Sequence, residues 1–297
     1  MSNENLLIYP TVDLFVYDLA DGIGQNENEI SQNRKQFWKK IYGDQISASQ
    51  LEKLKQAEAG TGDYIKLLGD PPEVKFESSL DGYAYPVKIG DTYAAQFDLS
   101  GKIEPDDKKY APEEIDRLGW QKEKITSRVN PPATIGQSWL VWGQLTANDQ
   151  DALETAKNCY TKLNLFSNAK WDRDLKADGK FLGADFYELW RPPGDRGNIG
   201  DNYHVLICLF PYKNGQSIDD INKTIDKLYV HLMQLFLFRN KMIWAYTQSR
   251  QVKGRLKESS GEIQQLVNQL IARVNAPKVD LKELQKDLVD FLTISSA

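Results

Sequence analysis

The fold is decided by residues 217–275, SIDDINKTIDKLYVHLMQLFLFRNKMIWAYTQSRQVKGRLKESSGEIQQLVNQLIARVN, which read as one very long helix. Ser217 is placed to cap its first turn, and Asp219 and Asp220 favour the positive end of the helix dipole. Pro277 ends the helical run. At 1.5 Å per residue, an unbroken helix of this length would extend roughly 90 Å.

A seven-residue apolar repeat runs along this helix and is interrupted at Arg239, Ser249, Lys253 and Ser260. A sustained repeat of this kind predicts helices packed side by side, either within one protein or between copies. Together with Ile218 and Ile221, the residues to which the repeat assigns a helix-packing role are Ile225, Leu228, Leu232, Leu235, Met242, Tyr246, Leu256, Ile263, Val267, Leu270 and Val274.

The helix has two parts with different patterns. From Ile225 to Tyr246 it is apolar nearly all round, which predicts burial against a sheet. If they are buried in this way, replacing Leu228, Leu232 or Leu235 by Ala would cost about 2–5 kcal/mol. Toward the C-terminus the apolar stripe narrows, which is typical of a coiled-coil seam or a helical hairpin. Residues 279–293 are expected to form a return helix.

The preceding residues predict an α+β fold. Each half reads strand–helix–strand–strand–helix, which predicts two ferredoxin-like (split βαβ) modules in tandem, with or without one shared sheet. Asn130-Pro131-Pro132 marks the break between them, so the expected divisions are 1–130, 131–216 and 217–297. The expected strands are Leu6–Tyr17, Tyr83–Ile89, Tyr93–Leu99, Ile135–Leu145, Phe181–Trp190 and Tyr203–Phe210. The expected helices are one from Asn28 or Ser31 to Gly43, one over Ser47–Ala59, and those over Pro112–Ser127 and Asn148–Leu163.

Composition points to a cytoplasmic protein. The two cysteines, Cys159 and Cys208, allow one disulfide, although two buried thiols in a reducing compartment are favoured. The N-terminal residues have neither the basic start nor the apolar core of a secretory signal. No stretch reaches the ~18 uncharged apolar residues that a spanning helix requires. Whether the natural protein continues past Ala297 stays open.

Positive charge is concentrated in the long helix. Between Val230 and Lys257 there are six basic residues and no Asp or Glu, so with a net charge of −5 the remainder carries −5 − 6 = −11. Such a helix can meet an acidic protein, anionic lipid or nucleic acid, but a solvated face paired with the chain's own acidic part is favoured. The candidate anion-binding or partner-binding residues are Arg239, Lys241, Arg250, Lys253, Arg255 and Lys257.

The sequence predicts no catalytic residue, cofactor or metal site. His204 and His231 lie in apolar segments and are expected to be packed or partly exposed rings. Residues 172–179 fail the calcium-loop pattern and are read as a turn. Gly194, Gly197 and Gly200 lie in a hairpin loop that opens no helix. Trp139 and Trp142 are expected on opposite faces of their strand, whereas Trp190 is a candidate partner anchor.

Two resemblances arise. Val12-Asp13-Leu14-Phe15-Val16-Tyr17 with Asn33-Arg34-Lys35-Gln36-Phe37-Trp38 resembles accessory (CATRA-like) modules of prokaryotic conflict systems associated with caspase-like proteases and TPR repeats, which implies a defence or signalling role. An α+β body followed by a long helix and a return helix resembles the cytoplasmic part of CorA-type magnesium channels. That family implies a membrane segment with a Gly-Met-Asn motif, which this chain lacks, so only the architecture is similar.

Three functions follow as hypotheses. The first is a non-enzymatic interaction or regulatory protein that oligomerises or docks a protein partner through its long helix, because the repeat is strong and no catalytic constellation is visible. The second is the soluble part of a CorA-like, membrane-associated protein whose membrane segment is missing from this chain. The third is an enzyme whose Asp or Glu side chains are brought together only by the fold.

Overall fold

The computed structural model describes residues 5–43, 46–76, 81–101, 110–165, 168–191, 203–213 and 217–275, with Lys282, Gln285, Lys286, Leu288 and Val289. The chain divides into two compact units, Met1–Trp244 and Ala245–Ala297. The first unit is mixed α/β, and the second contains the C-terminal part of the long helix. The sequence instead predicted boundaries near residues 130 and 216.

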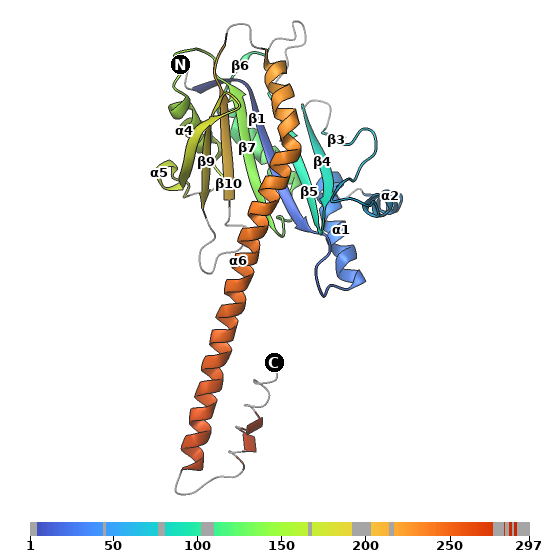
Figure 1. Cartoon of the computed structure of the whole chain (residues 1–297), viewed down its shortest axis with the longest axis vertical. Helices are drawn as coiled ribbons and strands as arrows, with labels where there is room; N and C mark the ends of the chain where they lie inside the picture. Colours follow the sequence, from blue (N-terminus) through green and yellow to red (C-terminus); the bar gives the residue numbers. More distant parts are fainter. Residues whose placement is uncertain are drawn as a thin grey trace. The chain divides into compact units, whose positions relative to one another are not determined.

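One ten-stranded sheet organises the first unit, with the order β2-β4-β5-β1-β7-β10-β9-β8 (Figure 1). Short strands β3 and β6 pair with β4 and β1. Among the described pairs only β7 and β10 run parallel, so the sheet is mixed. The strands are β1 (Leu6–Leu19), β2 (Tyr64–Lys66), β3 (Val74–Lys75), β4 (Gly82–Ile89), β5 (Thr92–Leu99), β6 (Pro112–Glu114), β7 (Gly136–Gln144), β8 (Leu175–Phe181), β9 (Ala184–Arg191) and β10 (Tyr203–Phe210).

Strand β1 is an inner strand, as its sequence predicts. Leu14 and Val16 belong to the core on one face of the sheet, and Phe15 and Tyr17 to the core on the other. Apolar side chains in both directions require layers on both faces. The predicted hairpin of β4 and β5 is also confirmed, and Gly90 at its turn has a φ of +57°, which favours glycine.

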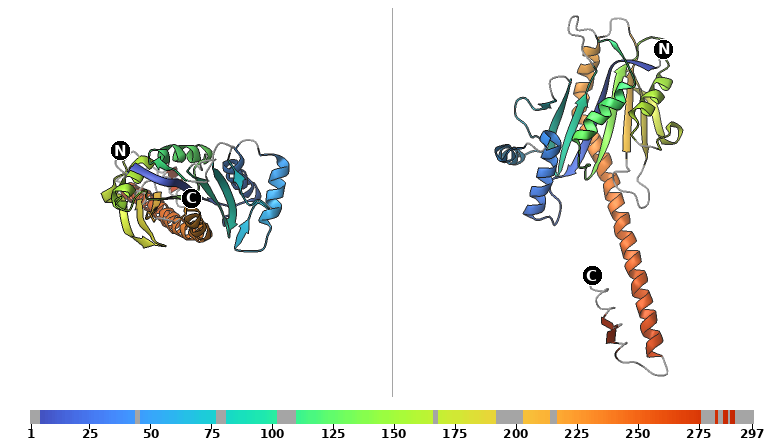
Figure 2. Two further views of the ribbon diagram at one scale, coloured as in Figure 1. Left: turned by 90° about the horizontal axis from the view of Figure 1, so that it is seen from above. Right: turned by 180° about the vertical axis from the view of Figure 1, so that it is seen from behind.

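Helices cover both faces of the sheet. Helices α1 (Glu27–Tyr42), α3 (Arg117–Arg128) and α4 (Ala152–Leu163) pack on one face, and the first part of α6 (Ile218–Val274) packs on the other (Figure 2). The shorter helices are α2 (Ala48–Glu58) and α5 (Trp171–Asp174). Trp139 and Trp142 lie in the two different cores, which confirms that they point to opposite faces.

The expected tandem of ferredoxin-like modules is not confirmed. A second split βαβ unit starting at β7 would place an antiparallel strand beside it, whereas β10 runs parallel to β7. The cause is an extra strand in the second half, because β8, β9 and β10 form an antiparallel meander that reverses the direction once more than predicted. Strands from both halves therefore belong to one mixed sheet.

Local differences from the sequence interpretation have identifiable causes. Residues 172–179 do not form a turn, because they complete α5 and enter β8, which pairs with β9. The helix expected over Pro112–Ser127 begins only at Arg117, because Pro112–Glu114 pair with β1 as strand β6. The N-cap of α1 is Asn26, whose side chain accepts from the amides of Asn28 and Glu29.

The long helix is confirmed, since α6 spans Ile218–Val274. The side chains that it buries on the sheet follow the seven-residue repeat only as far as Leu232. Ile218, Tyr229 and Asn240 are buried and lie 11 residues apart, the spacing of a straight helix. A seven-residue repeat drifts ~20° per heptad around such a helix. Consequently the row of side chains at the seven-residue repeat positions, called the heptad line below, turns away from the sheet.

The remaining expectations concern the two cysteines, the C-terminal residues and the glycine-containing loop. Cys159 and Cys208 are both free and buried, which is the alternative that the sequence favoured. The predicted return helix lies largely outside the described residues, and the five described positions between 282 and 289 are helical. The loop with Gly194, Gly197 and Gly200 is also outside them. Over the described parts of the chain, no helix combines the length and apolar character needed to cross a membrane.

Candidate functional site

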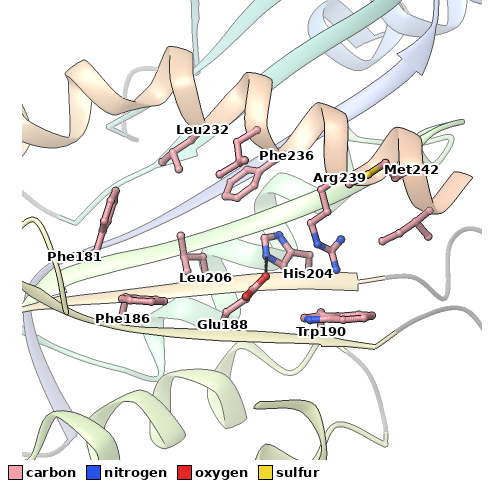
Figure 3. A pocket seen from close by; sticks show the side chains of 12 residues that line it. Phe181, Phe186, Glu188, Trp190, His204, Leu206, Leu232, Phe236, Arg239 and Met242 are labelled. Atoms are coloured by element: carbon pink, nitrogen blue, oxygen red, sulfur yellow. Dashed lines mark hydrogen bonds and ion pairs between the residues drawn. The ribbon is translucent and has the colours of Figure 1, made fainter. Parts of the chain in front are cut away.

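A pocket of about 510 Å³ lies in the first unit between α6 and strands β9 and β10. Its volume is in the range of small-molecule sites. Figure 3 shows α6 on one side and the strands on the other, with aromatic side chains at intervals along the pocket. Nine lining residues are apolar and three are polar or charged: Phe181, Phe186, Trp190, Leu206, Leu232, Leu235, Phe236, Met242 and Ile243, with Glu188, His204 and Arg239.

A directed hydrogen-bond chain leads from α6 into this pocket. Asn240 Nδ2 donates to Ser138 Oγ at 3.0 Å, so the Ser138 hydroxyl is free to donate to His204 Nδ1 at 3.1 Å. His204 Nε2 then carries the proton and donates to Glu188 Oε1 at 3.1 Å. Burial lowers the pKa of His204, and the His204 hydrogen bond lowers the pKa of Glu188. The pair is therefore a neutral imidazole and a carboxylate near pH 7.

Arg239 is the cationic group of the pocket. It extends from α6, and its guanidinium lies over the Trp190 ring, 5.2 Å from the centroid (Figure 3). Both terminal nitrogens are buried and have no hydrogen-bond partner among the described residues. Burial lowers the pKa of Arg239 to about 10, which still leaves it charged at pH 7. Unpaired buried donors are costly, so an acceptor placed at these two nitrogens would be stabilising.

A second buried polar cluster lies beneath α6, where Asp13 of β1 faces Asp98 of β5 across the strand pair. Gln96 Nε2 donates to Asp13 Oδ1 at 2.7 Å, and the Tyr229 hydroxyl donates to Asp13 Oδ2 at 3.1 Å. Burial raises the pKa of Asp13 to about 7. Burial and the Asp13 charge together raise the pKa of Asp98 well above its ordinary value. Ser100 also donates to Asp98.

These carboxyls make the stability of the first unit depend on pH. The folded-state pKa values of these two carboxyls lie above the unfolded ones. The free energy of unfolding therefore falls as the pH rises, by about 1.4 kcal/mol per pH unit for each carboxyl that is protonated only in the folded state. That loss begins near the unfolded pKa of ~4 and continues to about pH 7 for Asp13 and beyond it for Asp98.

The variant Asp98→Asn should flatten this pH dependence. Its amide can donate to Asp13 as a protonated Asp98 would, and it has no proton to lose. We expect it to unfold at higher denaturant concentration than the wild type above pH 7, measured by tryptophan fluorescence from pH 5 to about 9. Asp149→Asn on an exposed loop is the control. An unchanged pH slope in Asp98→Asn would show that Asp98 is ionised in the folded protein.

The six basic candidates are not brought together. Arg239 lies in the pocket, and Lys241 forms an ion pair with Asp91, as the solvated-face interpretation expected for this residue. Arg250, in the second unit, lies over the Tyr246 ring at 5.7 Å. Lys253, Arg255 and Lys257 are exposed. An anion-binding role for these last four residues stays a prediction.

The helix-packing candidates separate along α6. Ile225 and Leu232 are buried and Leu228 is half-buried, so these three pack on the sheet. The expected burial of Leu235 is wrong, because this side chain is 60% exposed as the heptad line leaves the sheet. Further along the same line, Met242, Tyr246, Leu256 and Val274 are exposed, and Ile263, Val267 and Leu270 are half-buried.

Reasoning from sequence missed Glu188, Ser138 and Asn240, which join in space although they lie on three elements. The sequence did contain one signal for this cluster, because Arg239 and Asn240 are polar residues within the apolar part of the helix. The pair Asp13 and Asp98 had a similar signal, since each is a charge in a strand that is mostly apolar.

His204 is held on both ring nitrogens, and the described lining residues of the pocket include neither serine nor cysteine. Asp13 and Asp98 are buried and are not among these lining residues. Within the described ranges, no three His, Cys, Asp or Glu are grouped to hold a metal ion. Comparisons with protein-family models, curated proteins and solved structures gave no match to this chain.

Proposed function

We propose that this protein is a non-enzymatic interaction protein that self-associates through the heptad line of α6. The observation that carries the proposal is a row of apolar side chains on one helix that the sheet does not cover. We call this row the seam, and it consists of Leu235, Met242, Tyr246, Leu256, Ile263, Val267, Leu270 and Val274.

The seam has the spacing of an interhelical contact. A seven-residue repeat is useful to a helix only when a second helix supercoils with it, because a straight helix rotates such a repeat out of any flat contact. The sheet takes the 11-residue line of Ile218, Tyr229 and Asn240. The heptad line beyond Leu232 is therefore left for another helix.

The exposed part of α6 also needs support. In the second unit, nearly every side chain from Gln251 to Glu262 is exposed. Helices without tertiary packing are marginal in water, since most helical stability in proteins comes from burying an apolar face. Leu256 is 66% exposed and Val274 57% exposed, so among the described residues part of the face that a partner would bury is exposed.

A second copy of this chain is the occupant that the symmetry of the seam favours. In this register a parallel pair of copies brings Val252 opposite Lys257 and Leu266 opposite Ile271, so like charges do not meet at these flanking positions. Lys253 takes an inner position and faces its own copy, which lowers the stability of the pair and selects its register. A symmetric interface lets the same seam meet itself.

Sedimentation of the whole chain over a range of concentrations tests this proposal. We expect a reversible oligomer for the wild type. In the double variant Leu256→Glu/Val267→Glu, two seam positions carry charge, which should raise the dissociation constant on the order of a hundredfold. Gln265→Glu places the same charge on the outer side of the helix and should leave association unchanged.

Two results would contradict self-association: a wild type that is monomeric at every concentration, or seam variants that associate as the wild type does. Circular dichroism of the double variant checks that the chain is still folded. A monomeric wild type would direct attention to a different helical partner. The resemblance of Val12–Tyr17 and Asn33–Trp38 to accessory modules of conflict systems favours a signalling or defence setting for such a protein.

A further inference from the structure

We propose that the pocket between α6 and strands β9 and β10 is a binding site for a small amphipathic carboxylate, with Arg239 holding the carboxylate and the aromatic and aliphatic walls holding an apolar body. The site lies entirely within Met1–Trp244, and two of its lining residues, Leu235 and Met242, also belong to the seam. The inference starts from a guanidinium whose two terminal nitrogens are buried beside a cavity without an acceptor among the described residues.

The chemistry of Arg239 selects an oxyanion. Its two terminal nitrogens present parallel donors, the geometry that a planar carboxylate accepts in a bidentate manner. Trp190 covers one face of the guanidinium and fixes its plane. An apolar ligand alone would leave both nitrogens unsatisfied, which costs more than filling the pocket gains at that end.

The charge of the pocket selects a single negative charge. Glu188 is the only carboxylate among the described lining residues, and one of its oxygens is occupied by the His204 hydrogen bond. Arg239 offsets one bound anionic charge, but a dianionic phosphate would meet Glu188 without a second cation in the lining. His204 is held neutral between Ser138 and Glu188, so it adds no positive charge near pH 7.

The apolar part of the pocket selects the body of the ligand. Phe181 and Phe186 lie toward the end away from Arg239, and Leu206 and Phe236 lie between (Figure 3). Such walls recognise a chain or a ring by burial and carry no polar group that would orient it. Orientation therefore comes from Arg239, and an alkyl or aryl carboxylate meets both requirements.

Isothermal titration of the whole chain with octanoate, octan-1-ol and octylammonium tests the proposal, since the three share one apolar body. We expect octanoate to bind about tenfold or more tightly than octan-1-ol, and octylammonium to bind worst of the three. Arg239→Met keeps an unbranched apolar stem and removes the guanidinium and its charge, so the ratio of octanoate to octan-1-ol affinity should fall to about one.

Two further variants keep the result interpretable. Arg255→Met, on an exposed part of α6, should retain the wild-type preference. Leu206→Trp fills the pocket and should weaken octanoate and octan-1-ol alike, which tests the location even if Arg239→Met does not fold. The proposal is overturned if no probe binds, if octanoate and octan-1-ol bind the wild type equally, if octylammonium binds best, or if Arg239→Met keeps the preference.

Discussion

Replacing Lys40 by Met should lower the free energy of unfolding of the first unit by about 3–5 kcal/mol, because it leaves a buried carboxylate without its cation. Lys40 Nζ lies 2.5 Å from Asp18 Oδ2, and both side chains are almost completely buried. Burial lowers the pKa of Lys40, while Asp18 opposes that shift. The other Asp18 oxygen accepts from the backbone amide of Thr134 at 2.9 Å, so the carboxylate also joins α1 to the segment before β7.

Denaturant unfolding followed by tryptophan fluorescence measures this effect, since all seven tryptophans lie in Met1–Trp244. Lys35→Met on the exposed side of α1 is the matched control and should change the unfolding free energy by less than about 0.5 kcal/mol. The double variant Lys40→Met/Asp18→Asn removes both charges and keeps the acceptor for Thr134, so it should recover most of the loss. A Lys40→Met protein as stable as the control would show that the ion pair has no net effect.

Replacing Phe236 by Ala should cost about 3–5 kcal/mol, whereas the same change at Phe238, two residues later on α6, should cost less than about 1 kcal/mol. Phe236 is 2% exposed, and Phe238 is 60% exposed. The Phe236 ring meets Phe15 of β1 edge-on at 5.3 Å and the His204 ring at 5.0 Å. Its removal leaves a cavity where α6 packs on the sheet. The free energy of that cavity adds to the free energy lost because the ring is no longer buried.

The same fluorescence measurement separates the two phenylalanine variants. The comparison tests which face of α6 packs on the sheet. Both changes are Phe to Ala within one helix, so they alter helix propensity equally, and the two side chains differ in the direction that they face. Equal losses would mean that Phe238 is also covered, so that α6 meets a second surface on that side. A negligible loss at Phe236 would mean that the first part of α6 is not held on the sheet as described.

The local elements could be predicted from sequence because their signals are local. The long helix was expected over residues 217–275 and is found over Ile218–Val274, since caps and apolar periodicity act within a few turns. Strand β10 and the β4–β5 hairpin have the expected places, and the hairpin is determined by alternating side chains and the Gly90-Asp91 turn between its strands.

The failures concern contacts between distant residues. The second half was expected to form its own antiparallel module, and a third strand over Leu175–Phe181 made β10 parallel to β7 instead. The segment Leu175–Phe181 contains Lys, Asp and Gly and therefore resembles a turn in composition. Only its pairing with β9 makes it a strand. Burial of Leu235 was expected from the repeat, but beyond Leu232 the repeat turns away from the sheet and Leu235 is exposed.

By itself, the sequence predicted that inner strands such as β1 pack core on both faces, that Cys159 and Cys208 are buried and free, and that α6 is one continuous helix. These properties follow from short-range periodicity, which each segment carries alone. Only the tertiary structure decided which face of α6 meets the sheet, that Asp13 receives the Tyr229 hydroxyl from 216 residues away, and that Arg239 lies over Trp190 in a pocket. Each of these depends on the relative placement of strands and helix, which is set by packing the whole core at once.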